Sequence, residues 1–462
     1  MTALWTSAEA EASTLGHASR AFEANGISID TRTLEPGNLF VALRGDARDG
    51  HDFVRAAFEG GAAAALVARD PGNLPADAAL LTVAHTQRGL EDLGRASRAR
   101  SNAKIVAVTG SAGKTTTKEM LRLAFGALGR THASAASYNN QWGVPLTLAA
   151  MPRDTQFGVI EIGMNHFGEI RSLVGFARPH VALVTTIAPA HLEFFGNCEA
   201  IADAKSEIFE GLEAGGTAII PADSPFAERL ALRAKQAGVT RILCFGSKKG
   251  ADTRLISASE SDGGQKVEAD ILGRVLTIRI AAPGAHIAHN AVAALLAVAE
   301  AEGDVLNAAA ALSRFEALKG RGAQFRIPVA GGHVAVIDES YNANPASMAA
   351  ALGLLGSVQT SGRRLAVLGD MLEMGPEGPA HHAALAAEIE AAGVDLVFAN
   401  GSQMKALWDV LPAARRGAYG ASSADIAPKL IAALKPGDVV LVKGSLGSKM
   451  AVVINALKAL AG

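Results

Sequence analysis

One short segment constrains the fold and the chemistry of this chain more than any other. An apolar run, Val106–Thr109, leads into a glycine loop that ends in Gly113-Lys114-Thr115, and helix-forming residues follow. In a loop of this kind, glycines let backbone N–H groups approach phosphate oxygens, the lysine supplies a positive charge, and the threonine hydroxyl can reach a phosphate-bound magnesium ion. The segment therefore predicts a nucleotide phosphate site at the end of a buried strand.

The loop is shorter than the full Walker A pattern. That pattern has a glycine five residues before Gly113, where this chain has Val108, so the motif is Gly110-x-x-Gly113-Lys114-Thr115. A shortened loop points away from motors and signalling GTPases. The alternative interpretation is an ordinary strand-to-helix turn that carries a surface lysine, and the strand before and the helix after the loop disfavour it.

Composition bounds the class of protein. A chain of 462 residues, 49% hydrophobic and 19% charged, is too long for one core and predicts a soluble enzyme of two or three domains. Its net charge of −2 excludes a global basic field for nucleic acid or an acidic membrane surface. Cys198 and Cys244 are the only cysteines, which suits a reducing compartment, and we expect both to be buried filler. No targeting or membrane-spanning segment is evident, so we expect a cytoplasmic protein without membrane insertion.

The chain divides by texture into three α/β parts. Residues 1–100 form a small α/β module with strands at 27–32 and 38–43 and a helical stretch at 52–65. Residues 101–318 alternate strands and helices, which is typical of a P-loop ATPase with a mostly parallel, doubly wound sheet, and alternation at 265–280 predicts an antiparallel flap. Residues 319–462 restart the alternation as a Rossmann-like domain. The third part has no Gly-x-Gly-x-x-Gly fingerprint, so NAD binding is not inferred.

Three polar residues follow strands near the phosphate loop. Glu161 ends an apolar strand, where an unpaired buried carboxylate is costly, so it predicts a cation such as nucleotide-bound magnesium. The alternative is a strand-end glutamate paired with a lysine. His191 could ligate a second metal, although a lone loop histidine is commonly structural. Lys205, judged on physical grounds alone, is expected to be a solvated helix lysine.

Four motifs lie in order along the chain, at 109–117, 161–165, 189–193 and 204–208. They follow the order seen in the Mur ligases of bacterial peptidoglycan synthesis, and the chain resembles that family over its whole length. Asp30-Thr31-Arg32 and the segments 36–43 and 49–53 resemble the UDP-sugar module of the two later ligases. Residues 340–345 and 368–371 resemble the member that adds D-alanyl-D-alanine. The likeness implies an ATP-dependent ligase of UDP-N-acetylmuramoyl-tripeptide and D-Ala-D-Ala.

The resemblance also implies the chemistry. ATP would phosphorylate the tripeptide carboxylate to an acyl phosphate, and the dipeptide amine would then displace phosphate, so catalysis rests on positioning and charge neutralisation. Lys114, Lys205 and His191 are the implied catalytic residues. Two Mg²⁺ ions are implied, the first held by Thr115 and Glu161 and the second by His191. Lys205 matches a lysine that is carbamoylated in the family.

Other residues are carried over from the same motifs. The implied nucleotide-binding residues are Thr109, Gly110, Ser111, Ala112, Gly113, Lys114, Thr115, Thr116, Asn290, Arg321 and Asp338, and either Asp338 or Glu339 is expected at the ribose. The family's His-Asn pair reads His286-Ile287 in this chain, so only the asparagine expected at the adenine, Asn290, is retained. The implied substrate residues are Asp30, Arg32, Asn139, Asn140, Asn342 and Asn344. An Asx turn is the alternative for the Asn139-Asn140 pair.

Other functions remain as alternatives. The preceding, diamino-acid-adding ligase carries an Asp-Asn-Pro-Arg motif that is absent here, and a folylpolyglutamate synthase would lack the first hundred residues. A nucleotide-binding protein without catalysis would have no need of the set formed by Lys114, Glu161, His191 and Lys205. We expect the enzyme to be a monomer.

Overall fold

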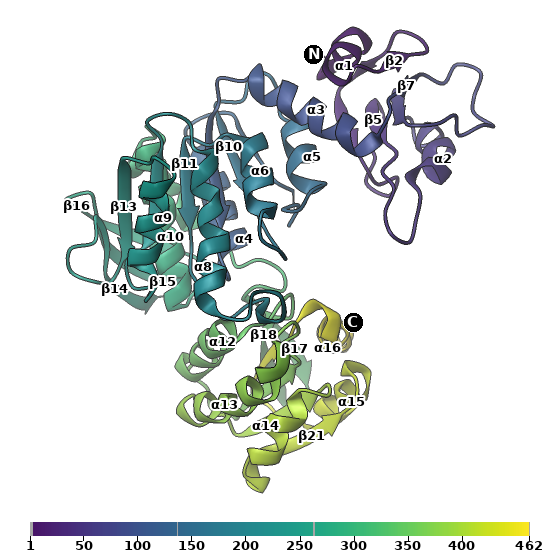
Figure 1. Ribbon diagram of the computed structural model, residues 1–462. Helices are drawn as coiled ribbons and strands as arrows, with labels where there is room; N and C mark the ends of the chain where they lie inside the picture. Colours follow the sequence, from purple (N-terminus) through teal and green to yellow (C-terminus); the bar gives the residue numbers. More distant parts are fainter. Residues whose placement is uncertain (1–2, 136, 262–263, 462) are drawn as a thin grey trace.

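Three α/β domains follow one another along the chain. The computed structural model describes residues 3–135, 137–261 and 264–461. Figure 1 shows the central domain, drawn in teal, between the purple N-terminal module and the third domain, drawn in green to yellow. The predicted fold class is confirmed: each of the three domains has a sheet of its own, and the sheets are mostly parallel.

The N-terminal module is built on a five-stranded sheet of order β2-β7-β6-β5-β4, beside a β1-β3 pair. Its strands are β1 (Trp5–Thr6), β2 (His17–Ala18), β3 (Glu23–Ala24), β4 (Gly26–Ser28), β5 (Asn38–Val41), β6 (Ala64–Val67) and β7 (Leu80–Thr82). Its helices are α1 (Ser7–Thr14), α2 (Val54–Glu59) and α3 (Thr86–Ala99). Helix α3 packs on α5 of the central domain and joins the two domains.

The helix predicted at 52–65 is wrong over its second half. Helix α2 ends at Glu59, and Gly60 and Gly61 follow, the latter with φ of +88°. Ala64 and Ala65 belong to β6, which is buried throughout and lies between β5 and β7. Alanine is small enough for a strand covered on both faces, so alanine content alone could not separate helix from strand here.

The central sheet has nine strands in the order β16-β15-β14-β13-β12-β11-β8-β10-β9. The strands are β8 (Lys104–Thr109), β9 (Thr131–Ala133), β10 (Phe157–Glu161), β11 (Val181–Val184), β12 (Thr217–Pro221), β13 (Arg241–Gly246), β14 (Thr253–Ser261), β15 (Gly264–Ile271) and β16 (Arg274–Ile280). The predicted antiparallel pair at 265–280 is confirmed as β15 and β16. It is no separate flap, however, because β14 joins it to the parallel sheet.

Helices cover both faces of this sheet, and alternate residues of β8 point to opposite sides. Val106 and Val108 pack with α4 (Lys114–Gly126) and α10 (Ala285–Glu300), whereas Ile105 and Ala107 pack toward the other layer. The remaining helices are α5 (Gly143–Ala149), α6 (Glu169–Ala177), α7 (Leu192–Phe195), α8 (Cys198–Ser206), α9 (Ala227–Gln236) and α11 (Val305–Ala311). Cys198 and Cys244, expected as buried filler, are only half-buried.

The third domain has a six-stranded sheet of order β17-β18-β22-β19-β20-β21, parallel except for the β17-β18 hairpin. Its strands are β17 (Ala323–Val329), β18 (Gly332–Glu339), β19 (Arg364–Gly369), β20 (Leu396–Asn400), β21 (Arg416–Gly420) and β22 (Val439–Lys443). Its helices are α12 (Pro345–Ser357), α13 (Gly378–Ala391), α14 (Met404–Val410), α15 (Ser423–Ala433) and α16 (Ala451–Lys458). Within the described ranges, no helix has both the length and the apolar character that crossing a membrane requires.

Candidate active site

A cavity of about 1090 Å³ lies between the central and third domains. The carboxyl ends of the parallel strands β8, β10 and β18 deliver loops to it, as expected for open α/β sheets. Its central-domain lining includes Ser111, Ala112, Gly113, Lys114, Thr115, Thr116, Asn139, Asn140, Glu161, His191 and Asn290. Its third-domain lining includes Arg321, Glu339, Tyr341, Asn342, Asn344 and Lys443. The structure thus brings most of the predicted site residues to one place.

The phosphate loop is held close to the neighbouring strand. A Cβ atom on Gly110 would fall 1.9 Å from the Thr185 hydroxyl oxygen, and Gly113 begins α4 with φ of +81°, so both positions require glycine. Ser111 donates its backbone N–H to the Thr186 carbonyl at 2.8 Å. The loop is therefore shaped before any ligand arrives, with the first N–H groups of α4 directed at the cavity.

Lys114 is the cation of this loop. Its Nζ donates to the Gly110 carbonyl at 2.7 Å, so in this structure the ammonium group folds back over the loop. Burial lowers the pKa of Lys114; Glu161 acts in the opposite direction, and Arg321 adds to the lowering. An anionic phosphate at this position would favour the charged lysine, because opposite charges stabilise each other strongly where water is excluded.

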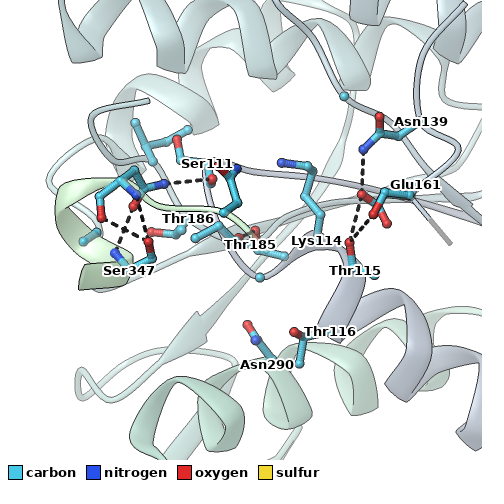
Figure 2. Close-up of a pocket in the computed structure, with 18 of the residues that line it drawn as sticks. Ser111, Lys114, Thr115, Thr116, Asn139, Glu161, Thr185, Thr186, Asn290 and Ser347 are labelled. Atoms are coloured by element: carbon cyan, nitrogen blue, oxygen red, sulfur yellow. Dashed lines mark hydrogen bonds between the residues drawn. The ribbon is translucent and has the colours of Figure 1, made fainter. Parts of the chain in front are cut away.

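Thr115 and Glu161 form a candidate magnesium site. The Thr115 hydroxyl lies 3.2 Å from Glu161 Oε1, and Asn139 Nδ2 donates to the same oxygen at 2.7 Å (Figure 2). The other oxygen, Oε2, is buried without a partner. An unpartnered buried carboxylate oxygen beside a threonine hydroxyl fits a nucleotide-bound Mg²⁺, which takes few protein ligands and fills the rest of its octahedron with phosphate and water.

The magnesium site would depend on such outside ligands. Across the described residues, no cluster of three or more histidine, cysteine, aspartate or glutamate side chains is placed to hold a metal ion. The protein therefore offers single ligands around the cavity rather than a preformed cage. This distribution fits magnesium that arrives with a nucleotide.

Physical reasoning alone predicts that Lys205 is a solvated helix lysine, and this prediction is wrong. Instead of a solvated helix lysine, it is a side chain with 1% exposure at the end of α8. Burial, reinforced by the charge of Lys114, holds the pKa of Lys205 well below its usual range. Lys205 is outside the set of residues that line the cavity, although the charge of Lys114 in the phosphate loop acts on it. A buried lysine of this kind favours the neutral, nucleophilic amine.

His191 lies at the rim of the cavity and precedes the short helix α7. Its Nδ1 is 2.5 Å from Oε2 of Glu373, a residue of the third domain. The hydrogen bond to the carboxylate lowers the pKa of Glu373, against the effect of burial. The carboxylate occupies Nδ1 and leaves Nε2 as the nitrogen available to a ligand.

Arg321 lies in the turn of residues 319–322 that joins the central and third domains, here called the hinge. Arg321 lines the cavity, whereas Asp338 does not. Arg321 donates to the Ser137 hydroxyl at 3.3 Å, and its guanidinium stacks 4.1 Å from the centre of the Tyr341 ring. Asp338, predicted to bind nucleotide, is buried; its carboxylate accepts from the backbone N–H of Gly320 and from Ser340. The structure places Glu339, its neighbour, in the cavity wall. The two side chains point to opposite faces of β18, which excludes Asp338 from the cavity.

Three of the four predicted substrate asparagines accept a local backbone N–H with their side-chain oxygen, and in Asn342 the donor is the N–H of Ala343 at 2.9 Å. Asn140 Oδ1 accepts from the N–H groups of Trp142 and Gly143, which matches the Asx-turn alternative. Asn344 Oδ1 caps α12 through the N–H of Ser347, and its Nδ2 donates to the Ser111 carbonyl at 3.2 Å. Asn342 is more exposed than Asn344 and is the better placed of that pair to meet a ligand. Asn342 and Asn344 lie in the loop of residues 340–345, which follows β18. Strand β18 is the second strand of the third domain, because β17 precedes it.

The remaining predicted residues do not line the cavity: two belong to the phosphate loop and two to the N-terminal module. Thr109 and Gly110 support the phosphate loop but do not line the cavity. Asp30 and Arg32 lie in the N-terminal module and form an ion pair whose closest atoms are 2.5 Å apart. Hydrogen bonds from Arg32 lower the pKa of Asp30 to about 2. The structure therefore keeps these two residues apart from the phosphate loop, in a different module.

Sequence reasoning missed several residues of the cavity wall. His289 stands directly before Asn290 on α10, and its Nε2 lies 3.0 Å from the Ser247 hydroxyl. Lys443 is buried and donates to Glu339 and to the Asn342 carbonyl. Burial lowers the pKa of Lys443. His289 is next to Asn290 in the sequence, whereas the place of Lys443 in the cavity wall depends on the register of β22 against β18.

Comparisons with known proteins agree with this geometry. The domain family described as "Mur ligase family, catalytic domain" matches residues 23–117, "Mur ligase middle domain" matches 108–298, and "Mur ligase, glutamate ligase domain" matches 325–446. The chain is 36% identical to the UDP-N-acetylmuramoyl-tripeptide–D-alanyl-D-alanine ligase of Escherichia coli, over 94% of each chain. It is 31% identical to the enzyme of that name from Rickettsia prowazekii, over 95% of this chain and 96% of the relative.

A solved structure extends the likeness to three dimensions. The crystal structure of MurF from Acinetobacter baumannii matches with a TM-score of 0.85 at 29% identity, and the match covers 98% of this chain and 99% of that one. The fold and the relatives together define an ATP-dependent, amide-forming class of enzyme. This chain belongs to the Mur ligase family.

Proposed function

We propose that the protein is the ligase that joins D-alanyl-D-alanine to UDP-N-acetylmuramoyl-tripeptide at the expense of ATP. The observation that carries this function is the single cavity shared by the phosphate loop and the 340–345 loop, in a chain related end to end to enzymes named for this reaction. An activated carboxylate and an attacking amine can meet there, away from bulk water.

Each domain has one task in this proposal. Residues 1–100 bind the UDP precursor, and Asp30 and Arg32 belong to that surface. Residues 101–318 bind ATP. Residues 319–462 contact the nucleotide and the dipeptide. The separation of the Asp30–Arg32 pair from the phosphate loop supports this division, because the precursor is long enough to need sites on different modules.

The first half-reaction transfers the γ-phosphoryl group of ATP to the tripeptide carboxylate. Lys114 releases the Gly110 carbonyl and meets the phosphates, together with the N–H groups at the start of α4. Asn290 packs against Gly113 from α10 and is proposed to contact the nucleotide. Arg321 reaches across from the hinge to Ser137, beside the phosphate loop, and is proposed to neutralise phosphate charge.

Two magnesium ions belong to this site. Thr115 and Glu161 would hold the first, and the unpartnered Glu161 Oε2 supports that assignment. His191 would hold the second through Nε2. When bound, such ions neutralise charge on the transferring phosphoryl group. Asn139 donates to Glu161 Oε1, which would leave Oε2 for the ion.

Lys205 is proposed to carry a carbamate. Its neutral Nζ would attack the carbon of CO₂: an N–C bond forms, one C=O π bond opens to give the carboxylate, and a proton leaves the nitrogen for solvent, so that a neutral amine becomes an anion. The depressed pKa and the nearness of Lys114 support this modification, because a buried carbamate beside a lysine is better paired than two ammonium groups. In this role the carbamate of Lys205 would supply a carboxylate-like anion for the second magnesium.

The second half-reaction is attack by the dipeptide amine on the acyl phosphate, with loss of inorganic phosphate. Asn342, which faces the cavity from the loop after β18, is the proposed contact for the dipeptide, with Asn344 holding the loop in place. Asn139 and Asn140 lie on the opposite wall, where the tripeptide end of the precursor would arrive.

The test is ATP-dependent phosphate release with purified UDP-tripeptide, with and without D-Ala-D-Ala, together with mass spectrometry of the product. We expect release to match amide formation one to one and to require both substrates. ATP turnover without a new amide bond under any substrate combination would overturn the proposed function.

A further inference from the structure

One short loop of the third domain, residues 370–375, reaches back to the rim of the cavity. Glu373 places its Oε2 2.5 Å from His191 Nδ1, and its backbone carbonyl accepts from the Glu193 N–H at 3.1 Å. Both Glu373 and His191 have left-handed backbone conformations, with φ of 62° and 58°. Residues other than glycine adopt that region uncommonly, so the surrounding structure holds both in place.

The loop is fastened to its own domain at three successive residues. Asp370 accepts the Met404 N–H at 2.8 Å, Met371 donates its N–H to His382 Nε2 at 2.9 Å, and Leu372 donates to the Ser445 hydroxyl at 3.0 Å. The next residue is Glu373. Its carboxylate is consequently carried by the third domain as part of a rigid unit.

The surface that the loop of residues 370–375 contacts belongs to the central domain. His191 precedes the short helix α7, and Leu192 packs against the hydrophobic cores of both the central and the third domain. Gly375, at the end of the loop, lies against the backbone of Glu193. The contact between Glu373 and His191 therefore exists only where the third domain is docked on α7.

We propose that Glu373 is a positioning residue that acts through His191. A neutral imidazole whose Nδ1–H is bound to a carboxylate is fixed as one tautomer and one ring orientation, with the Nε2 lone pair free for a metal. The inference rests on the proposed function, in which His191 Nε2 holds the second magnesium. Glu373 is outside the cavity lining, so it does not touch the substrates itself. If Glu373 positions His191 in this way, the second metal site becomes complete only when the third domain docks.

The first test reads the tautomer of His191 directly. Full-length enzyme labelled with ¹⁵N-histidine is studied by long-range ¹H–¹⁵N NMR with a non-hydrolysable ATP analogue and UDP-tripeptide, and His191 is assigned by its loss in His191→Gln. We expect the Nδ1–H form in the wild type and in Glu373→Gln, which keeps an acceptor. We expect conversion toward the Nε2–H form in Glu373→Ala. An unchanged His191 tautomer in Glu373→Ala would overturn the proposal.

The second test reads metal affinity rather than turnover. Mn²⁺ binding is followed by electron paramagnetic resonance with the same ATP analogue. We expect Glu373→Ala to weaken one ion by about 10- to 100-fold and to leave the other within about twofold. Glu377→Ala is the matched control, because Glu377 is 82% exposed in the adjoining turn and pairs only loosely with His381.

The two tests separate the positioning role from the proposed function. If His191→Ala loses one ion while Glu373→Ala binds both with wild-type affinity, the positioning role is wrong. If His191→Ala also binds both ions normally, the second-metal assignment in the proposed function is wrong, and the tautomer measurement still decides whether Glu373 positions the ring.

Discussion

Asn344 Nδ2 donates a hydrogen bond to the Ser111 carbonyl at 3.2 Å, so the residue that caps the first long helix of the third domain also touches the phosphate loop. The two residues are 233 positions apart in the chain. Arg321 to Ser137 and Glu373 to His191 are further contacts between the same two domains. The docked third domain and the phosphate loop, where we expect the nucleotide to bind, are therefore in direct physical contact.

Replacing Asn344 by serine should separate its two roles. Serine keeps a helix cap for the Ser347 N–H but is too short to reach Ser111, so we expect near-normal stability and a loss of about tenfold in kcat/KM, the value of one hydrogen bond of about 1.4 kcal/mol. Asn344→Ala should lose both, with stability lower by about 1 kcal/mol. Thermal unfolding and steady-state ligation measure the two effects. Wild-type kcat/KM in Asn344→Ser would contradict a catalytic value for the contact.

Lys114→Ala should abolish ligation. Its ammonium group is the cation of the phosphate loop, and loss of such a group costs at least about a hundredfold in rate. Binding of the UDP precursor, measured by calorimetry, should stay unchanged because Asp30 and Arg32 lie on another module. Arg122→Ala, an exposed position on the same helix, is the control. Activity within tenfold of the wild type would rule out the assigned role of the phosphate loop.

Features of the site that are made of consecutive residues could be predicted from the sequence, whereas those that depend on residues far apart in the chain could not. The phosphate loop was recognisable because its strand, glycines, lysine and helix are consecutive, and Glu161 because a carboxylate ended an apolar strand. Asp338 and Glu339 could not be told apart, since adjacent strand residues face opposite sides and only the assembled sheet decides which side meets the cavity. The burial of Lys205 and the partnership of Glu373 with His191, 182 positions apart, come from tertiary packing that no local pattern encodes.

Lys205→Ala should be almost inactive and partly recovered by short carboxylic acids such as formate or acetate. The small anion would occupy the space left by the carbamate, whereas neutral acetamide should have no effect. Lys235→Ala, an exposed lysine on α9, should behave as wild type. Intact-mass analysis of the active enzyme should show the added mass of CO₂ under mild conditions. An active enzyme with an unmodified Lys205 in a high-resolution electron-density map would remove the carbamate from the mechanism.

Arg98 should matter for stability rather than chemistry. Its buried guanidinium donates to the carbonyl oxygens of Ala177 and Arg178, both at 2.8 Å, and so ties helix α3 to the end of α6. Removing these charge-assisted hydrogen bonds leaves carbonyl groups unpaired, and we expect Arg98→Ala to lower the free energy of unfolding by about 2 to 3 kcal/mol. Arg88→Ala, at an exposed position of the same helix, should change it by less than about 0.5 kcal/mol. Chemical denaturation followed by circular dichroism measures both variants.

The acceptor should be a dipeptide and not a free amino acid. The loop after β18 opens into the cavity opposite the phosphate loop, and its exposed residue Asn342 offers an amide that can both donate to and accept from a zwitterionic dipeptide without burying a charge. Docking of the third domain would bring the dipeptide amine to the acyl phosphate and exclude the water that would hydrolyse it. Incorporation of D-Ala-D-Ala is compared with that of meso-diaminopimelate, L-lysine and L-glutamate, each with its matched UDP-precursor. Asn342→Ala should raise the KM for the dipeptide by about tenfold and leave the KM for ATP unchanged. Preferred ligation of any single amino acid would show that this chain performs a different step of the family's chemistry.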